Sequence, residues 1–280
     1  MQIGVVGNLG YPELASFLDR LQVAAPSAGV TLAFEPALHE LVPRAERMEP
    51  GKEIEALITL GGDGTFLRGT RVLDGREVPI LGVNLGRLGF LTACGGDDAE
   101  DALRRFARGD YVAEPRMMLE AQLSRSGVAL ESWFALNDVV LHAGGKARVI
   151  RMVIDANGER IASYAADGLI LATPTGSSAY SLSSGGPIVH PELESIGLTP
   201  ISPHSLTVRP LLLAPTTTVS LRVADDGSEQ LITVDGQESA EFVYGDVLTV
   251  RRATRRALLV RFPETTFFAR MRHKMGWGGS

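Results

Sequence analysis

The chain has 280 residues, of which 45% are hydrophobic, enough to bury one large core or two smaller ones. Its formal net charge of −6 argues against a general nucleic-acid binder, which normally carries a basic face. The single cysteine, Cys94, excludes an internal disulfide and a thiolate-based zinc site, and we expect it to be a small buried or loop residue. Because the sequence shows neither a signal peptide nor an apolar run of membrane-spanning length, we predict a cytoplasmic protein that does not bind membranes.

Short apolar segments alternate with helical patterns over the first part of the chain. Strands are predicted at 2–7, 30–35, 55–60 and 78–84, and helices at 12–25, 65–73 and 97–109. Pro12 suits the first position of its helix, and Thr65 suits the N-cap of the next one. Alternation of this kind predicts a mostly parallel sheet with helices on its faces.

Past about residue 111 the pattern changes to consecutive strands, and this β-rich region covers about 150 residues. Strand-like segments lie at 116–125, 133–142, 147–173, 218–237 and 246–262. Asn157-Gly158 and Asp226-Gly227 are hairpin turn signals, and we expect two strands within 246–262. The last segment, 263–277, returns to helical spacing and carries Arg270, Arg272 and Lys274, which would reach a phosphate if this helix folded back.

A glycine-rich segment, Gly61-Gly62-Asp63-Gly64-Thr65, separates a predicted strand from a predicted helix. Glycine lets the backbone approach a ligand closely, and the N–H groups of a helix N-terminus attract an anion. The segment lacks the G-x-x-x-x-G-K-[ST] pattern of a P-loop. A tight turn with Asp63 in a solvated bend would explain the same residues, but the flanking strand and helix favour a phosphate site.

Asp63 places a carboxylate where further negative charge is expected to bind. It can hold Mg²⁺, directly or through water, which would neutralise the cluster. Alternatively, it can accept the proton of a hydroxyl group that attacks phosphorus. Both interpretations indicate phosphoryl transfer to an alcohol.

A second segment, 169–192, carries eight hydroxyl groups from Thr173 to Ser184, counting Tyr180. Such groups suit sugar hydroxyls, amides and adenine edges, and the glycines among them allow close approach of the backbone. A flexible Ser/Gly linker is the alternative. Tyr180, Leu182 and Gly185-Gly186-Pro187 disfavour a linker, because a disordered segment has no need of them.

These segments together resemble the NAD kinase family. Its motifs occur in the family's order as GGDGT at 61–65, GVNLGRLGFLT at 82–92, Asn-Asp at 137–138, DGLILATPTGSSAYSLSSGGPIV at 167–189 and PISPHSLTVRP at 200–210. The similarity covers most of 57–210 and extends weakly to the KMGW at 274–277. GGDGT also occurs in lipid kinases of the diacylglycerol kinase type, so TPTGSSAYSLS is the more specific motif.

The resemblance implies transfer of the terminal phosphoryl group of ATP, or of polyphosphate, to the 2′-hydroxyl of the adenosine ribose of NAD. It also implies a divalent metal, most often Mg²⁺, and a homodimer or homotetramer. We expect an α/β N-terminal domain with a Rossmann-like parallel sheet and a β-rich C-terminal domain of the β-sandwich type, with the site in the crevice between them. We assign 1–110 to the first domain, joined by 264–280 as a helix that returns to it, and 111–263 to the second.

The resemblance also assigns the site residues. Asp63 matches the family's proton acceptor, and Gly61, Gly62, Gly64 and Thr65 form the phosphate loop, with Gly64 at the NAD ribose. The remaining residues expected to bind NAD are Asn137, Asp138, Arg148, Asp167, Thr175, Ser178, Ala179, Tyr180, Ser181, Leu182, Ser183 and Gln237. Many members have Glu at Asp138, Thr at Ser178 and Ala at Ser184. These departures bear on affinity rather than on the reaction, because Asp138 and Ser178 keep the hydrogen-bonding type of the residues they replace.

Two other functions fit part of the pattern. A lipid or sugar kinase would share the glycine loop but would leave the TPTGSSAYSLS segment unexplained. A non-enzymatic dinucleotide sensor would bind NAD without forming NADP, which the intact Asp63 disfavours. Incubation with ATP and either NAD or diacylglycerol separates the kinases, and NADP formation excludes the sensor.

Overall fold

The structure is a computed structural model that describes residues 1–49, 53–86, 89–145, 149–224, 229–264 and 266–277. It divides into two compact units, Met1–Pro115 with Ala257–Ser280, and Arg116–Arg256. The boundaries proposed from the sequence, 110/111 and 263/264, differ from these by a few residues. The difference has a physical reason, because the units change within two long strands, β7 (Val112–Arg125) and β18 (Asp246–Arg261), whose pattern is unbroken there.

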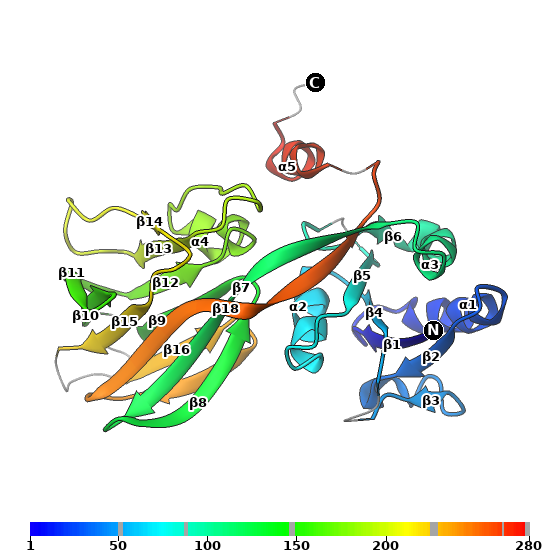
Figure 1. The fold of residues 1–280 in the computed structure, drawn as a ribbon, viewed down its shortest axis with the longest axis horizontal. Coiled ribbons are helices and arrows are strands. Elements are labelled where there is room, and N and C mark those ends of the chain that lie inside the picture. The colour runs from blue at the N-terminus through cyan, green and yellow to red at the C-terminus, as the bar shows by residue number, and fades with distance from the viewer. Residues whose placement is uncertain (50–52, 87–88, 146–148, 225–228, 265, 278–280) are drawn as a thin grey trace. The chain divides into compact units, whose positions relative to one another are not determined.

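The first unit is built on a parallel sheet. Its strands are β1 (Gln2–Gly7), β2 (Thr31–Phe34), β3 (Glu46–Arg47), β4 (Ala56–Leu60), β5 (Pro79–Asn84), β6 (Cys94–Gly95) and the end of β18. Its helices are α1 (Leu14–Ser27), α2 (Asp63–Val72), α3 (Ala99–Ala107) and α5 (Phe267–Met275), with the 3-10 turns η1 (Pro36–Leu38) and η2 (Gly96–Asp98). The strands lie in the order β18-β5-β4-β1-β2-β3, with β6 beside β5, and pair in parallel, which confirms the expected Rossmann-like sheet (Figure 1).

The strand order reverses between β1 and β4. From β1 the chain moves outward to β2 and β3, whereas from β4 it moves in the opposite direction to β5. Open parallel sheets bind ligands beyond the carboxyl ends of the strands at such a point. Gly7 and Leu60, the last residues of β1 and β4, are paired in register, so the segments that follow them emerge side by side.

The two faces of this sheet explain where the helices pack. In β4, Ile58 and Leu60 belong to the core that includes α1 and α3. Leu57 and Thr59 point to the opposite face, because side chains alternate along a strand. There a Cβ on Gly69 of α2 would lie 3.0 Å from Leu57 Cδ2, so the glycine lets α2 approach the strand closely.

The first two helices start elsewhere than predicted, α1 two residues later than Pro12 and α2 with its N-cap three residues before Thr65. Helix α1 begins at Leu14 with Glu13 as its N-cap, because Pro12 lies inside a turn in which Leu14 N donates to Tyr11 O at 3.1 Å. Helix α2 begins at Asp63 with Gly62 as its N-cap, so Thr65 lies in the first turn. Asp63 is therefore the first helical residue, where a carboxylate interacts favourably with the helix dipole.

The second unit is antiparallel and rich in strands. Besides parts of β7 and β18, its strands are β8 (Val128–Ala135), β9 (Asp138–Ala143), β10 (Ile150–Ala156), β11 (Glu159–Ala166), β12 (Gly168–Ala172), β13 (Ile196–Ile201), β14 (Leu211–Leu213), β15 (Val219–Val223), β16 (Gln230–Val234) and β17 (Glu238–Phe242). A 3-10 turn η3 (Gly176–Ser178) and a short helix α4 (Tyr180–Ser183) follow β12.

These strands form two layers around one core. One sheet has the order β14-β13-β12-β9-β16-β17, and the other layer holds β11-β10-β15-β18 and the hairpin β7-β8. Leu141 and Leu171 of the first layer share a core with Leu119, Met152 and Leu248 of the second. The expected β-sandwich is confirmed, and α5 belongs to the first unit, as the returning helix requires.

The turn predictions had mixed outcomes. Asn157 and Gly158 have φ of 51° and 85° and join β10 to β11, which confirms that hairpin. Asp226-Gly227 lies outside the described residues. The predicted strand at 133–142 is divided into β8 and β9, and the two strands predicted within 246–262 are the single strand β18.

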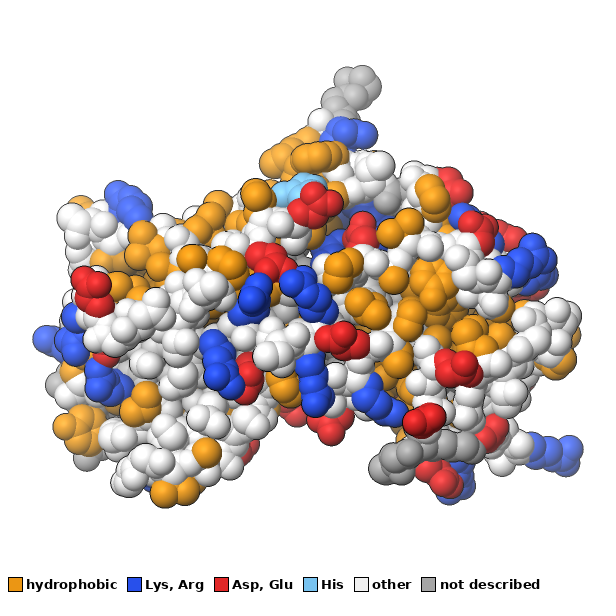
Figure 2. Space-filling view, in the orientation of Figure 1, with side chains coloured by type: hydrophobic (Ala, Val, Ile, Leu, Met, Phe, Trp, Pro, Cys, Tyr) orange, Lys and Arg blue, Asp and Glu red, His pale blue; other side chains and the backbone are white. Residues whose placement is uncertain are grey.

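In the middle of strand β18, Arg251, Arg252 and Arg255 are exposed while Ala253 and Ala257 are buried, so the strand stays continuous there. Arg252 and Arg256 pair with Glu194 at 2.7 Å and 2.5 Å. On the face shown in Figure 2, cationic and anionic side chains are interspersed rather than gathered by sign. In the part of the chain that the structure describes, no helix has the length and apolar composition needed to span a bilayer.

Cys94 lies in β6 and is partly buried. Burial raises the pKa of its thiol to about 12, with the Asp98 carboxylate adding to the effect. The thiol is therefore protonated at neutral pH, and since the thiolate is the nucleophile, Cys94 is a poor candidate for covalent catalysis.

Candidate functional site

A cavity of about 530 Å³ lies in the first unit, where the sheet order reverses. Its lining combines the end of β1 with the first turn of α2, from Gly7, Asn8, Leu9, Tyr11, Ala37, Gly62, Gly64, Thr65 and Arg68. The N-terminal N–H groups of a helix attract an anion. Three residues of the predicted phosphate loop, Gly62, Gly64 and Thr65, thus line one cavity. Gly61 does not, and a Cβ there would lie 2.9 Å from Thr65 Cβ.

Arg68 brings a fixed positive charge to this cavity. Its Nη1 and Nη2 donate to the two carboxylate oxygens of Glu35 at 2.7 Å and 2.9 Å. Glu35 is buried and also accepts the N–H of Gly7 at 2.8 Å, so the ion pair is tied to the end of β1. The sequence prediction missed Arg68, although its position four residues after Gly64 puts both on one face of α2.

Asp63 does not line this cavity, and its side chain is engaged elsewhere in the same unit. Its Oδ2 accepts the N–H of Phe90 at 2.8 Å, and its Oδ1 accepts the N–H of Leu91 at 2.9 Å. A Cβ on Gly89 would lie 2.5 Å from Asp63 Cγ, so only glycine permits this approach. The negative charge of the glycine-rich loop is thus matched by two backbone amides, and each oxygen keeps a lone pair for a further donor.

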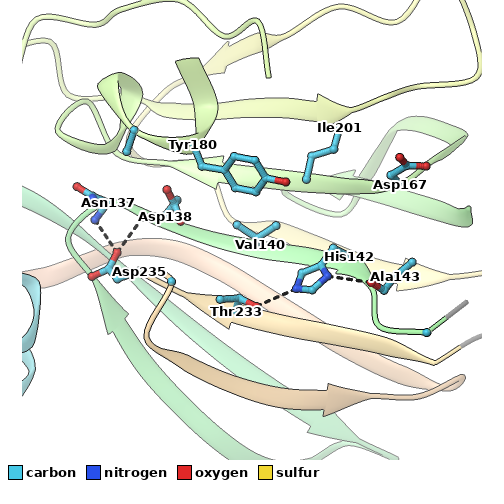
Figure 3. Close-up of a pocket in the computed structure, with 13 residues that line it drawn as sticks. Asn137, Asp138, Val140, His142, Ala143, Asp167, Tyr180, Ile201, Thr233 and Asp235 are labelled. Atoms are coloured by element: carbon cyan, nitrogen blue, oxygen red, sulfur yellow. Dashed lines mark hydrogen bonds between the residues drawn. The ribbon is translucent and has the colours of Figure 1, made fainter. Parts of the chain in front are cut away.

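A second cavity, of about 570 Å³, lies in the second unit (Figure 3). It is lined by Asn137, Asp138, Val140, His142, Ala143, Gly145, Asp167, Ala179, Tyr180, Ile201, Thr233, Asp235 and Gly236. Five of these were predicted from the sequence: Asn137, Asp138, Asp167, Ala179 and Tyr180. In Figure 3, Asn137 and Asp138 lie at one end, Asp167 lies toward the other, and the ring of Tyr180 lies between them.

The Asn137–Asp138 pair is held by a carboxylate that the sequence prediction missed, that of Asp235. It accepts the N–H groups of Leu136, Asn137 and Asp138 at 2.9 Å, 2.7 Å and 3.0 Å. These bonds satisfy a backbone that turns here instead of continuing as a strand, which is why 133–142 is divided. Asp235 itself has φ of 50°, in a turn that the pattern Val-Asp-Gly-Gln at 234–237 could have indicated.

Burial raises the cost of ionising both Asp138 and Asp235. Burial, and then the Asp235 carboxylate, raise the pKa of Asp138 to about 7. Burial also raises the pKa of Asp235, against the lowering effect of its three backbone hydrogen bonds. The end of the cavity that holds Asn137 therefore gains negative charge as the pH rises through about 7, because Asp138 loses its proton there.

This shift predicts a pH-dependent stability for Asp138→Asn. Because the folded-state pKa of Asp138 lies above its unfolded value of 3.8, the wild type loses stability as pH rises toward about 7. Asparagine cannot ionise, so we expect the melting temperature of the variant, relative to wild type, to rise between pH 5.5 and about 8. Thermal unfolding of both proteins across this range checks it, and a constant difference would contradict the raised pKa.

The hydroxyl-rich segment packs directly on Asn137. The N–H of Thr173 donates to Asn137 O at 2.8 Å, and Thr173 Oγ1 donates to Leu136 O at 2.5 Å. A Cβ on Gly176 would lie 2.6 Å from Asn137 Cα. Two motifs far apart in the sequence thus meet through backbone contacts that leave no room for a side chain at 176.

Several hydroxyl groups of this segment form hydrogen bonds within the fold. Ser177 Oγ donates to Pro174 O at 2.6 Å, Ser178 Oγ donates to Thr175 O at 3.2 Å, and buried Ser181 bonds Thr199 at 2.9 Å. Some of the eight hydroxyl groups in this segment therefore donate within the fold, which leaves their lone pairs as acceptors. Of the predicted residues, Thr175, Ser178, Ser181, Leu182, Ser183 and Gln237 do not line the cavity, and Arg148 lies outside the described residues.

His142 contributes a further polar group that sequence reasoning did not select. Its Nδ1 lies 3.0 Å from Ala143 O and its Nε2 lies 2.8 Å from Thr233 Oγ1 (Figure 3). A carbonyl can only accept, so Nδ1 carries a proton, and in neutral His142 the Thr233 hydroxyl donates to Nε2. The ring orientation is therefore fixed within the cavity wall.

The chain matches two family models that together span most of its length. Residues 4–111 match the ATP-NAD kinase N-terminal domain, and residues 136–262 match the ATP-NAD kinase C-terminal domain. It is 54% identical over 282 residues to a NAD kinase of Gemmatimonas aurantiaca, covering 100% of this chain and 97% of the relative. The chain belongs to the NAD kinase family. It is therefore an enzyme, as the resemblance had implied.

Further relatives and solved structures agree with this membership. A NAD kinase of Heliobacterium modesticaldum is 47% identical, with 99% of each chain covered. The structure of yeast NADH kinase complexed with NADH superposes with a TM-score of 0.90 at 26% identity, covering 100% of this chain and 88% of that one. A NAD kinase from Archaeoglobus fulgidus in complex with ATP gives a TM-score of 0.76 at 25% identity, with 100% of both chains covered.

Proposed function

We propose that the chain transfers the terminal phosphoryl group of ATP to the 2′-hydroxyl of the adenosine ribose of NAD, giving NADP. The observation that carries this proposal is the cavity of the second unit. Five residues that the family resemblance assigns to NAD binding come from three separate segments and line that one cavity. A lipid kinase would have no use for this arrangement.

The lining of this cavity suits a dinucleotide. Its volume falls within the range of about 300–1,000 Å³ that is common for small-molecule sites. The Asn137 amide can donate and accept, the Asp138 carboxylate can accept from a ribose hydroxyl, and the Tyr180 ring offers a flat apolar surface. Yeast NADH kinase, whose fold this chain shares, binds NADH.

The cavity of the first unit suits the phosphates of the donor. Gly62 and Gly64 expose the backbone at the start of α2, and Arg68 adds a guanidinium group held by Glu35. The Archaeoglobus fulgidus relative is a complex with ATP, which supports ATP as the donor here. Polyphosphate presents the same chemistry to such a cavity and stays a prediction.

In this proposal Asp63 accepts the proton of the 2′-hydroxyl as that oxygen attacks the terminal phosphorus. The proton passes to the lone pair of a carboxylate oxygen that the amides of Phe90 and Leu91 leave unused. Phosphoryl transfer demands little covalent chemistry from the protein, so positioning and charge stabilisation supply most of the rate. By holding the carboxylate in one orientation, the two amides position the proton acceptor and stabilise its negative charge.

The proposal includes a divalent cation, Mg²⁺. Among the described residues, no group of three or more His, Cys, Asp or Glu side chains is placed to hold a metal ion. Mg²⁺ fits such a chain, because it commonly binds through one or two carboxylates, water and substrate phosphates. When bound with the donor phosphates, it would neutralise charge that develops during transfer, and Asp63 is the carboxylate of the glycine loop available to it.

A coupled assay for NADP tests the proposed function. The protein is incubated with Mg²⁺, with ATP or polyphosphate as donor, and with NAD, NADH or diacylglycerol as acceptor. We expect NADP from ATP and NAD. NAD binding without turnover would instead identify a dinucleotide sensor, and phosphorylation of diacylglycerol alone would identify a lipid kinase.

We further propose self-association to a homodimer or homotetramer. Leu206, Leu211 and Leu212 of the second unit are exposed, and apolar side chains that gather on a surface mark interaction sites. Light scattering after size-exclusion chromatography measures the number of chains directly, and a monomer at micromolar concentration would contradict this proposal.

A further inference from the structure

The segment Phe90–Thr92 lies between Asp63 and two buried arginines, all within the first unit. On one side, the N–H groups of Phe90 and Leu91 donate to the Asp63 carboxylate. On the other side, the carbonyl oxygens of Phe90, Leu91 and Thr92 accept from guanidinium groups. The segment forms no helix or strand, so these bonds determine where its amides lie.

Arg261, the last residue of β18, makes the first set of contacts. Its Nη1 donates to Leu91 O at 2.9 Å and Thr92 O at 3.1 Å, and its Nη2 donates to Phe90 O at 2.8 Å. Its Nε lies 3.4 Å from a carboxylate oxygen of Glu114. The guanidinium plane is thus fixed at both edges while the residue is 5% exposed.

Arg270, on α5, makes the second set. Its Nη1 donates to Phe90 O at 3.2 Å and also to Thr92 O. The residue is 4% exposed, on a helix whose other cationic residues, Arg272 and Lys274, are not buried. The prediction that Arg270 reaches phosphate was therefore wrong, because the returning helix turns this side chain into the protein.

Satisfying buried carbonyl groups explains part of this arrangement, since an unpaired buried carbonyl is costly. It does not explain why two guanidinium groups converge on one three-residue segment whose amides bind the acid of the phosphate loop. Burying two cations has its own cost, which only multiple hydrogen bonds offset. Hydrogen bonds thus connect Arg270 of α5 and Arg261 of β18, through the segment Phe90–Thr92, to the Asp63 carboxylate.

We propose that Arg261 and Arg270 are positioning residues for phosphoryl transfer, acting through Phe90–Thr92 to hold the Asp63 carboxylate toward the acceptor hydroxyl. This inference rests on the proposed function, in which Asp63 accepts the proton. Neither arginine lines either of the two cavities. A small displacement of a catalytic group lowers kcat far more than it changes KM, because misplacement by about 1 Å can lower a rate by about 10²-fold.

The test uses Arg270→Lys and Arg261→Lys in the full-length protein. Lysine keeps the charge but cannot reach two carbonyl groups with a planar fork. For each variant we measure kcat, KM for NAD and KM for ATP, and the amide hydrogen exchange of the segment containing Phe90 and Leu91. Arg105→Lys is the matched control, because Arg105 also pairs with the C-terminal part of the unit, through Glu264 at 3.3 Å, without touching Phe90–Thr92.

We expect both variants to lower kcat by roughly 10- to 100-fold, with each KM within about threefold of wild type. Exchange of the Phe90 and Leu91 amides should become faster, and Asp63→Ala should speed exchange at the same amides. Arg105→Lys should leave kcat and this exchange unchanged. Faster exchange with unchanged kcat, or a lower kcat with unchanged exchange, would overturn the proposal.

This inference and the proposed function can fail separately. If the wild type forms no NADP, the proposed function fails and the catalytic role of the arginines fails with it. If the wild type forms NADP but the lysine variants match the Arg105→Lys control in kcat, only the positioning role is lost. Should either variant unfold at the assay temperature, measurement at a lower temperature, at which melting curves show a folded protein, gives the same comparison.

Discussion

Asp63→Ala is expected to lower kcat by at least about 10²–10⁴-fold, the usual contribution of a positioned general base. The loss should exceed this range if the freed amides of Phe90 and Leu91 also move, because the variant removes both of their acceptors. NAD binding should persist, since the cavity of the second unit does not include Asp63.

Alanine is a better substitution here than asparagine. The side chain of an Asp63→Asn variant would turn its NH₂ group toward one of two backbone N–H donors, and this repulsion would shift the segment for a reason unrelated to proton transfer. Alanine instead leaves an empty space where the carboxylate accepted the two N–H groups. If Asp63 accepts a proton, a small carboxylate such as formate should enter that space and restore part of the activity in a concentration-dependent way.

The measurement is kcat with and without formate, together with NAD affinity by calorimetry. Asp101→Ala is the control, because Asp101 is also an acidic residue in the first turn of a helix, α3, and its side chain is exposed. It should keep wild-type activity and show no response to formate. Normal turnover by Asp63→Ala would remove Asp63 from the mechanism.

Gly176→Ala should produce the largest loss of stability among conservative substitutions in the second unit. Its Cβ would lie 2.6 Å from Asn137 Cα, and the neighbouring atoms are backbone, which cannot rotate away. Overpacking usually costs about 1–3 kcal/mol, and a clash between two backbones should reach at least the upper end. We expect a melting temperature lower by about 6–12 °C, at roughly 2–4 °C per kcal/mol for a protein of this size.

The same substitution should weaken NAD binding, because any relief of the clash moves Asn137 and the hydrogen bond from Thr173. Gly197→Ala is the matched control. Its Cβ would lie 3.6 Å from Ala172 O, an ordinary contact, on β13, which pairs with the strand β12 that precedes Gly176. Differential scanning fluorimetry and NAD titration of both variants make the comparison, and equal melting temperatures would contradict the close packing at 176.

Much of the local architecture follows from short-range patterns. Gln2–Gly7 is a continuous apolar run bounded by glycine, and Leu14, Phe17, Leu18 and Leu21 repeat at helical spacing, so the first strand and helix could be predicted. Asn157-Gly158 supplied the positive φ that its hairpin needs. The strand–glycine–helix order around Asp63 and the family motifs likewise indicated phosphoryl transfer before any contact was known.

The limits of strands were harder to predict, because they depend on distant partners. Leu136 and Asn137 leave the strand pattern only because the Asp235 carboxylate, about one hundred residues further on, accepts their N–H groups. Strand β18 runs through an arginine-rich stretch because carboxylates of other elements pair with it. Strand propensity depends on nearby residues alone, so it predicts neither the break at Leu136–Asn137 nor the continuity of β18.

The sequence by itself determined the two classes of fold, and it singled out the glycine-rich loop at 61–65 and the residues Asn137, Asp138, Asp167, Ala179 and Tyr180, which line one cavity. Only the tertiary structure decided that Ser181 turns inward, that Arg68 faces the glycine loop, and that Arg261 and Arg270 converge on Phe90–Thr92. The physical reason is that a polar side chain takes whichever buried partner the fold brings within hydrogen-bonding distance. Spacing along the chain fixes such a partner only within a helix, a strand or a turn.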